Sequence, residues 1–362
     1  MKVVLLGRFP QTSILSGPQK FAFELFNQLL YLSKEFDINV YAIDYFFKEL
    51  NNSNFFTRFF GKDIIDENLR IFRFGWIRIL LFLVNQKPDI IHIVAVERYI
   101  VYILLLRCFF SAKILVTFHS SLKYEMHKRK YNRKYKDLLL EKLLLKGSDR
   151  NVFVSQLLKN LFEKTYGITL SDSTIIHNGC KPDSKPNITN KWDNPDKYNF
   201  VFYSGFNDNI DRGLDFLLDV FTEINNERFT LHIIGNRIDN DKRNIQFHSL
   251  MTPSEFFDFF IDKHFIIKSI TFDSFPIFVL EAMNYSLIPI INNNAGISEI
   301  IDNKINGFIY NKKEELINIL NLMLNNHFDL ENISQKSLSL AKNYCWETIA
   351  NQYLKEYELL IK

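Results

Sequence analysis

The chain has 362 residues, of which 47% are hydrophobic and 23% are charged, and its formal net charge is +3. This is an ordinary globular composition, and because the length exceeds what one hydrophobic core usually serves, we expect two domains. Its three cysteines, Cys108, Cys180 and Cys345, are far apart and lack metal-ligand spacing, which argues against a disulfide framework or a zinc site. A reducing, cytoplasmic environment fits this pattern.

The predicted elements begin at the N-terminal sequence MKVVLLGRFP, whose apolar run is too short for the core of a signal peptide and predicts a β-strand. Strand and helix patterns then alternate, which predicts a parallel α/β sheet. The expected strands are residues 3–6, 38–43, 89–94, 113–118 and 151–155, and residues 18–34 form the first amphipathic helix. No apolar run approaches the roughly 20 residues that cross a bilayer, so we expect no membrane span.

The most basic stretch of the chain is residues 123–147, where nine Lys and Arg are interleaved with tyrosines and followed by leucines at helical spacing. Three interpretations compete: a solvated helix face, a nucleic-acid patch, or a surface for anionic lipid and a lipid-linked acceptor. The residues of this basic patch are Lys128, Arg129, Lys130, Arg133 and Lys134.

A change of composition follows at residues 181–197, which are rich in Pro, Asn, Asp and Lys and predict a linker. Beyond them the strand-then-glycine pattern of the N-terminus returns, with expected strands at residues 200–205, 230–235, 265–270 and 288–292. The charge changes as well. Residues 1–180 hold 26 Lys and Arg against 16 Asp and Glu, a net charge of +10, whereas residues 181–362 hold 18 against 25, a net charge of −7.

The stretch DSFPIFVLEAM, residues 273–283, sets two acids eight positions apart. Asp273 closely follows an expected strand, Pro276 suits the first turn of a helix, and Glu281 comes about a turn further on. Carboxylates that lose water need partners, which can be cations, N–H groups or the hydroxyls of a ligand. The exposed N–H groups around residues 274–278 would form an anion site. The alternative is that both acids only complement the helix dipole.

Residues 273–301 resemble the donor-site signature of the retaining GT-B glycosyltransferases of family 4, in which an acid and seven further residues precede a Glu. Other family landmarks occur in the same order at residues 16–17, 87–93, 117–119, 153–162, 177–179, 204–218 and 346–360. The resemblance implies an α/β protein of two Rossmann-like domains facing across a cleft. These would be an acceptor domain (1–180), a linker (181–197), a donor domain (198–343) and a C-terminal helix (344–362) that returns to the first domain.

The resemblance also implies roles for single residues. Glu281 would hydrogen-bond the ribose of a nucleotide sugar, Asp273 would hold hydroxyls of the transferred sugar, and Arg212 would stabilise the departing diphosphate. His119, at the end of the strand 113–118, would lie near the donor sugar, so the expected catalytic residues are His119, Asp273 and Glu281. The other expected donor-binding residues are Gly17, Gly205, Ser274, Phe275, Pro276 and Ile277.

Two positions depart from the family pattern. The chain has Asp273 where the family usually has Glu, and Phe206 where the family has a phosphate-binding Arg. Arg212 matches a Lys of the family, so one of two phosphate-binding cations is kept. The sequence DND at 239–241 resembles the metal motif of a different transferase fold, and we interpret it as a solvated loop because no metal is required beside such a cation.

The resemblance therefore implies a metal-independent, retaining glycosyltransferase of the hexosyltransferase type that needs no cofactor. Its donor would be a UDP- or GDP-linked sugar, and its acceptor a glycan or lipid-linked glycan of surface polysaccharide biosynthesis. In this context the basic patch favours peripheral contact with an anionic membrane at the inner face of the cell membrane, and no nucleic acid is expected. The alternatives are a nucleotide-sugar epimerase or hydrolase of the same architecture, and a non-catalytic member that binds glycan or nucleotide.

Overall fold

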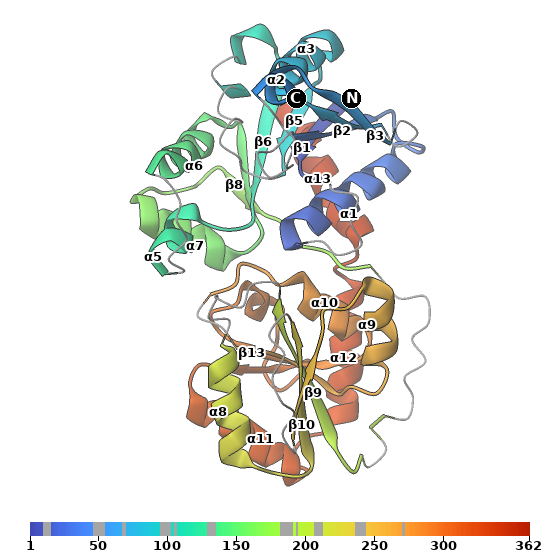
Figure 1. The fold of residues 1–362 in the computed structure, drawn as a ribbon, viewed down its shortest axis with the longest axis vertical. Coiled ribbons are helices and arrows are strands. Elements are labelled where there is room, and N and C mark those ends of the chain that lie inside the picture. The colour runs from blue at the N-terminus through green and yellow to red at the C-terminus, as the bar shows by residue number, and fades with distance from the viewer. Residues whose placement is uncertain are drawn as a thin grey trace. The chain divides into compact units, whose positions relative to one another are not determined.

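The computed structural model describes residues 1–9, 16–45, 55–66, 70–94, 103–104, 107–128, 135–181, 191–192, 195–205, 213–235, 244–269 and 272–362. The chain forms two compact units (Figure 1). The N-terminal unit comprises Met1–His177 and Trp346–Lys362, and the C-terminal unit comprises Asn178–Cys345. Within the described residues, no helix is both long and apolar enough to traverse a lipid bilayer.

The N-terminal unit is built on a sheet with the strand order β3-β4-β2-β1-β5-β6-β7-β8. Its strands are β1 (Lys2–Gly7), β2 (Asn39–Tyr45), β3 (Lys62–Asp66), β4 (Ile71–Phe74), β5 (Ile90–Ile93), β6 (Lys113–Phe118), β7 (Arg150–Phe153) and β8 (Ser173–Ile175). In the described part of this unit β3 pairs antiparallel with β4, and the other neighbouring strands are parallel. The order reverses between β1 and β5, as in doubly wound folds.

Helices of the N-terminal unit connect and cover these strands. They are α1 (Gly17–Leu32), α2 (Phe55–Phe60), α3 (Trp76–Gln86), α5 (Leu122–Lys128), α6 (Tyr135–Gly147), α7 (Gln156–Tyr166) and α13 (Trp346–Ile361), with a 3₁₀ turn η2 (Arg107–Phe109). The start of α1 is set locally, because Pro18 lies in its first turn and Gln19 Oε1 accepts a hydrogen bond from the N–H of the N-cap Ser16 (3.0 Å).

The C-terminal helix α13 belongs to the N-terminal unit, so the expected return of this helix is confirmed (Figure 1). A buried hydrogen-bond network fixes it on the sheet. His92 of β5 bonds to Tyr357 through Nδ1 (2.6 Å) and to Thr117 through Nε2 (2.8 Å), and Thr117 in turn bonds to Tyr353 (3.1 Å). Burial lowers the pKa of His92 well below its usual value, so the ring is neutral and can satisfy both partners.

The C-terminal unit holds a second parallel sheet with the order β11-β10-β9-β12-β13-β14. Its strands are β9 (Tyr198–Gly205), β10 (Phe229–Gly235), β11 (Ile245–His248), β12 (Phe265–Lys268), β13 (Ile288–Asn292) and β14 (Phe308–Tyr310). The helices are α8 (Leu214–Ile224), α9 (Pro253–Phe260), α10 (Ile277–Asn284), α11 (Lys313–Leu324) and α12 (Leu330–Lys342), with a 3₁₀ turn η3 (Gly296–Ile300). Helices α8 and α11 cover one face of the sheet, and α9, α10 and α12 cover the other (Figure 1).

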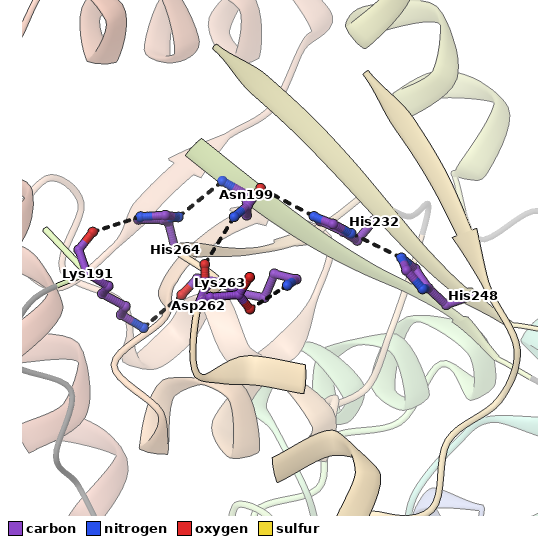
Figure 2. Close-up of polar contacts among 7 residues, drawn as sticks. All are labelled: Lys191, Asn199, His232, His248, Asp262, Lys263 and His264. Atoms are coloured by element: carbon purple, nitrogen blue, oxygen red, sulfur yellow. Dashed lines mark hydrogen bonds and ion pairs between the residues drawn. The ribbon is translucent and has the colours of Figure 1, made fainter. Parts of the chain in front are cut away.

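A chain of hydrogen bonds crosses this sheet from Lys191 to His248 (Figure 2). His264 Nε2 bonds to Lys191 O (2.9 Å), which can only accept, so His264 Nδ1 accepts from Asn199 N–H (3.1 Å). Asn199 Oδ1 meets His232 Nε2 (3.3 Å), and His232 Nδ1 meets His248 Nε2 (3.0 Å). All of these hydrogen bonds can form when the three histidine rings are neutral.

Lys191 and Trp192 lie within the segment 181–197 that the sequence predicts as a linker, but both belong to the C-terminal unit and bond to distant residues of it. The Lys191 ammonium donates to the carbonyls of Lys263 (2.8 Å) and Tyr285 (2.7 Å). Trp192 Nε1 donates to Ser334 Oγ (2.9 Å). Burial lowers the pKa of Lys191 to about 7.

Candidate functional site

The topology of the C-terminal unit points to one edge of its sheet. The strand order reverses between β9 and β12, and in open sheets of this type ligands bind outside the carboxyl ends of the strands at that point. There β9 ends at Gly205 and β12 ends at Lys268. Residues 272–276, here called the acidic loop, follow β12 and lead into α10, so Asp273 lies in this loop and Glu281 about one turn into the helix that follows it.

A buried lysine is paired with the first acid. Lys268 Nζ lies 3.1 Å from Asp273 Oδ2, and the two side chains are 8% and 23% exposed, respectively. The backbone of Asp273 is fixed as well, since its N–H donates to Asn294 O (3.2 Å) and its carbonyl accepts from Gly296 N–H (2.8 Å). Lys268 therefore orients a carboxylate that remains partly open to solvent.

Ser269 connects the end of β12 to the start of α8. Its hydroxyl donates to Gly213 O (2.7 Å), and Gly213 has a left-handed backbone with φ of 82°. A Cβ at Gly213 would lie 2.2 Å from Ser269 O, so only glycine fits. This contact fixes the chain immediately after Arg212, the predicted phosphate-binding cation.

The second acid, Glu281, lies on α10, which begins at Ile277 after the N-cap Pro276. This N-cap makes no side-chain capping bond, and the first N–H groups of a helix have no partner inside it. An anion at this helix start would therefore be favoured by these N–H groups and by the helix dipole. The carbonyl of Phe275 accepts from the buried Asn178 Nδ2 (2.8 Å).

The position of Glu281 weighs against the dipole alternative. Helix α10 has no acidic residue in its first turn, and Glu281 is the fifth residue of the helix. Because the dipole effect falls off within the first turn, complementing the dipole explains little of the placement of Glu281. Asp273 lies before the helix and is paired with Lys268. Complementing the dipole therefore does not by itself explain either carboxylate, and their roles toward a ligand stay predictions.

The N-terminal unit carries His119, which directly follows β6. Its ring lies edge-on to Phe21 with 4.4 Å between the centroids, and its Nε2 atom is buried without a hydrogen-bond partner among the described residues. Desolvation lowers the pKa of His119 to about 3. The imidazole is therefore neutral near pH 7 and can donate or accept a hydrogen bond, but it is not a cation.

Gly17 is the first residue of α1, and a Cβ there would meet no atom of the described residues within 4 Å. The predicted approach of a ligand to Gly17 remains a prediction, because residues 10–15, just before this helix, lie outside the described residues. Among the described residues, no group of three or more His, Cys, Asp and Glu side chains could hold a metal ion, and metal independence stays a prediction.

Several predicted positions lie outside the described residues. They are Phe206, Arg212, the sequence at 239–241, and Arg129, Lys130, Arg133 and Lys134 of the basic patch. Lys128 is the last residue of α5. The predicted roles of all these residues remain predictions.

Sequence reasoning missed Lys268, Ser269 and Asn178 as parts of the site. A signal existed for Lys268, because a lysine inside the otherwise apolar strand FIIK must find a partner when the strand is buried. The signal for Asn178 was its place in the family landmark at residues 177–179, but no local pattern shows that it bonds to Phe275, 97 positions away in the sequence.

Comparison with solved structures gives matches over almost the whole chain. Sucrose-phosphate synthase from Thermosynechococcus elongatus aligns with a TM-score of 0.74 and 13% identity, covering 99% of this chain and 98% of that one. The Anabaena protein HepE in complex with UDP aligns with a TM-score of 0.73 and 13% identity, covering 99% of this chain and 100% of that one. HepE in complex with UDP-glucose aligns with a TM-score of 0.69 and 13% identity, again covering 99% of this chain and 100% of that one. Because the sequence identity is only 13%, these matches show similarity of fold alone.

A curated relative is described as an uncharacterized 41.2 kDa protein in the cps region of Klebsiella pneumoniae. It is 25% identical over 121 residues, which is 32% of this chain, and the match spans a third of the relative's length. Residues 27–184 match the family Glycosyltransferase Family 4, and residues 184–339 match the family Glycosyl transferases group 1. The chain belongs to the GT-B glycosyltransferases of family 4 and group 1.

Proposed function

We propose that this glycosyltransferase moves a hexose from a nucleoside diphosphate sugar, UDP- or GDP-linked, to a glycan or lipid-linked glycan, with retention of the anomeric configuration and without a metal. The bond from the anomeric carbon to the diphosphate breaks, a bond from that carbon to the acceptor oxygen forms, and the proton of the acceptor hydroxyl leaves with the diphosphate. The cps-region relative and the UDP and UDP-glucose bound to HepE support a nucleotide-sugar donor and a role in surface polysaccharide biosynthesis.

The observation that carries this proposal is the acidic loop leading into α10 at the switch point of the sheet. Breaking the anomeric bond develops negative charge on the leaving diphosphate, and the N–H groups at the start of α10 oppose that charge without reorganising. Asp273, oriented by Lys268, would accept hydrogen bonds from sugar hydroxyls, and Glu281 would accept them from the ribose.

In the N-terminal unit, His119 would contribute a neutral imidazole toward the donor sugar. Its Nε2 has no partner among the described residues, so a sugar hydroxyl would satisfy a polar atom that is otherwise desolvated. The acceptor would come to this unit, and the basic patch would hold the enzyme at an anionic membrane on its cytoplasmic side.

Purified protein incubated with UDP- and GDP-sugars, with and without glycan acceptors, tests the proposal. Transfer requires an acceptor, and proton NMR of the product reports whether the anomeric configuration is retained. Epimerisation without an acceptor would favour the epimerase alternative, and binding without nucleotide release would favour the non-catalytic one. Turnover that persists with a metal chelator would support metal independence, whereas its loss would contradict it.

Calorimetry with UDP and GDP tests the ribose contact. Glu281→Gln should weaken binding by about 10- to 150-fold, because a charged hydrogen bond is lost. Glu314→Gln is a matched control, since Glu314 lies in the first turn of α11, where an acid does complement the helix dipole. Equal nucleotide affinity of the two variants would contradict the proposed role of Glu281.

A further inference from the structure

Asn178 is a buried asparagine whose side chain bonds to the acidic loop. It is the first residue of the C-terminal unit and is 4% exposed. Its Nδ2 donates to Phe275 O at 2.8 Å. Because a carbonyl oxygen can only accept, the amide nitrogen must face Phe275, and Oδ1 must point elsewhere.

The oxygen atom of the Asn178 side-chain amide is in a different situation from its nitrogen atom. Asn178 Oδ1 is buried and has no hydrogen-bond partner among the described residues. A buried acceptor without a partner is unfavourable, and this cost offsets part of what the bond to Phe275 O contributes to stability. The net gain in stability from Asn178 is therefore small, whereas its effect on the geometry of the acidic loop is direct.

The bond that Asn178 does make controls the entry to α10. Phe275 is 2% exposed, and the next residue, Pro276, is the N-cap of α10 and has no N–H of its own. Pro276 also makes no side-chain capping bond, so the helix start lacks the usual local anchor. The hydrogen bond from Asn178 fixes the plane of the peptide that joins Phe275 to Pro276, and this plane sets the direction in which the helix begins.

We propose that Asn178 is a positioning residue for the donor diphosphate. It holds the Phe275–Pro276 peptide so that the first N–H groups of α10 face the diphosphate oxygens, and it acts through the backbone without touching the donor. This inference rests on the proposed function, because it assigns a support to the diphosphate end of the same donor site.

The test replaces the amide and measures binding of UDP and GDP against binding of uridine and guanosine by calorimetry. Asn178→Asp keeps the shape of the side chain but places a carboxylate oxygen against Phe275 O. We expect it to weaken binding of the nucleoside diphosphate about tenfold and to change binding of the nucleoside by less than about twofold. Asn178→Ala, which removes both amide atoms without adding charge, should show the same selective loss.

Asn284→Asp is the matched control. Asn284 is also buried, at 2% exposure, and its Nδ2 also donates to a backbone carbonyl of the same unit, that of Lys181 (3.1 Å). It is the last residue of α10, so its replacement perturbs the opposite end of the helix. Thermal unfolding of all variants separates stability from affinity.

The outcomes are distinct. If the wild-type protein binds neither UDP nor GDP, the proposed donor site fails and the inference fails with it. If the wild type binds but Asn178→Asp and Asn178→Ala lose no more diphosphate affinity than Asn284→Asp, the inference alone is refuted. Equal losses for nucleoside and nucleoside diphosphate would likewise overturn it, because they would show a general disturbance of the unit.

Discussion

The ion pair between Lys268 and Asp273 predicts that these residues act as one group in sugar transfer. At 3.1 Å the two charges attract by about 5 kcal/mol for an effective dielectric constant of about 20, before the cost of desolvation is subtracted. After that cost, a charge-assisted hydrogen bond typically contributes about 1.5–3 kcal/mol. Losing one such bond in the transition state lowers the rate about 10- to 150-fold. Asp273→Asn should lower kcat/KM by this factor and leave UDP or GDP affinity nearly unchanged, because the bare nucleotide has no sugar for Asp273 to hold.

Lys268→Met should lower kcat/KM less than Asp273→Asn, about tenfold, because Lys268 acts only by orienting the carboxylate. The double variant should then be no slower than Asp273→Asn. Thermal unfolding gives a second readout. Removing the acid should destabilise the protein more than removing the lysine, since Lys268 is the more buried partner and would be left with a buried charge.

The assay is the initial rate with the best donor found for the wild type, measured for both single variants and the double variant. Asp262→Asn is the matched control, because Asp262 pairs with the similarly buried Lys263 just before β12 begins, at the other end of the same strand. It should leave kcat/KM unchanged. Multiplicative losses in the double variant, or full activity of Asp273→Asn, would refute the reasoning.

Two further predictions follow from other parts of the structure, and a third follows from the basic patch in the sequence. Gly213→Ala should lower the free energy of unfolding by about 2 kcal/mol or more, because the new Cβ would clash with Ser269. Gly167→Ala is also at positive φ, but no described atom lies within 4 Å of its new Cβ, and it should cost about 1 kcal/mol; equal costs in denaturant titrations would contradict the clash. Burial lowers the pKa of His264 to about 4 from about 6.5, so the unfolded chain binds more protons between these values and stability should fall by up to about 3 kcal/mol as pH falls through them. An NMR titration that gives a pKa above 6 for His264 would refute this. The protein should sediment with anionic but not with neutral liposomes, and added salt should release it. Replacing the residues of the basic patch with glutamines should abolish this binding. Equal sedimentation with both liposome types, or with neither, would contradict the proposed binding of the patch to anionic membranes.

Much of the fold could be predicted because burial leaves a local pattern. Val3 to Leu6 of β1 are fully buried, and such continuous apolar runs, separated by amphipathic helices, indicate a parallel sheet. Strands β3, β4, β8, β11 and β14 were not predicted. They are short and only partly buried, and β8 has no buried residue, so the periodicity that marks a strand is weak there.

For the candidate site, the sequence by itself supplied the acids at Asp273 and Glu281 and the helix start between them, because these features lie within one short segment. The tertiary structure alone brought Asn178 to the carbonyl of Phe275 and aimed the Lys268 ammonium at Asp273. It also brought Ser269 to Gly213, 56 positions away in the sequence. Local patterns report which residues are buried, whereas the order of the strands decides which distant residues meet, and no periodicity in one segment encodes that order.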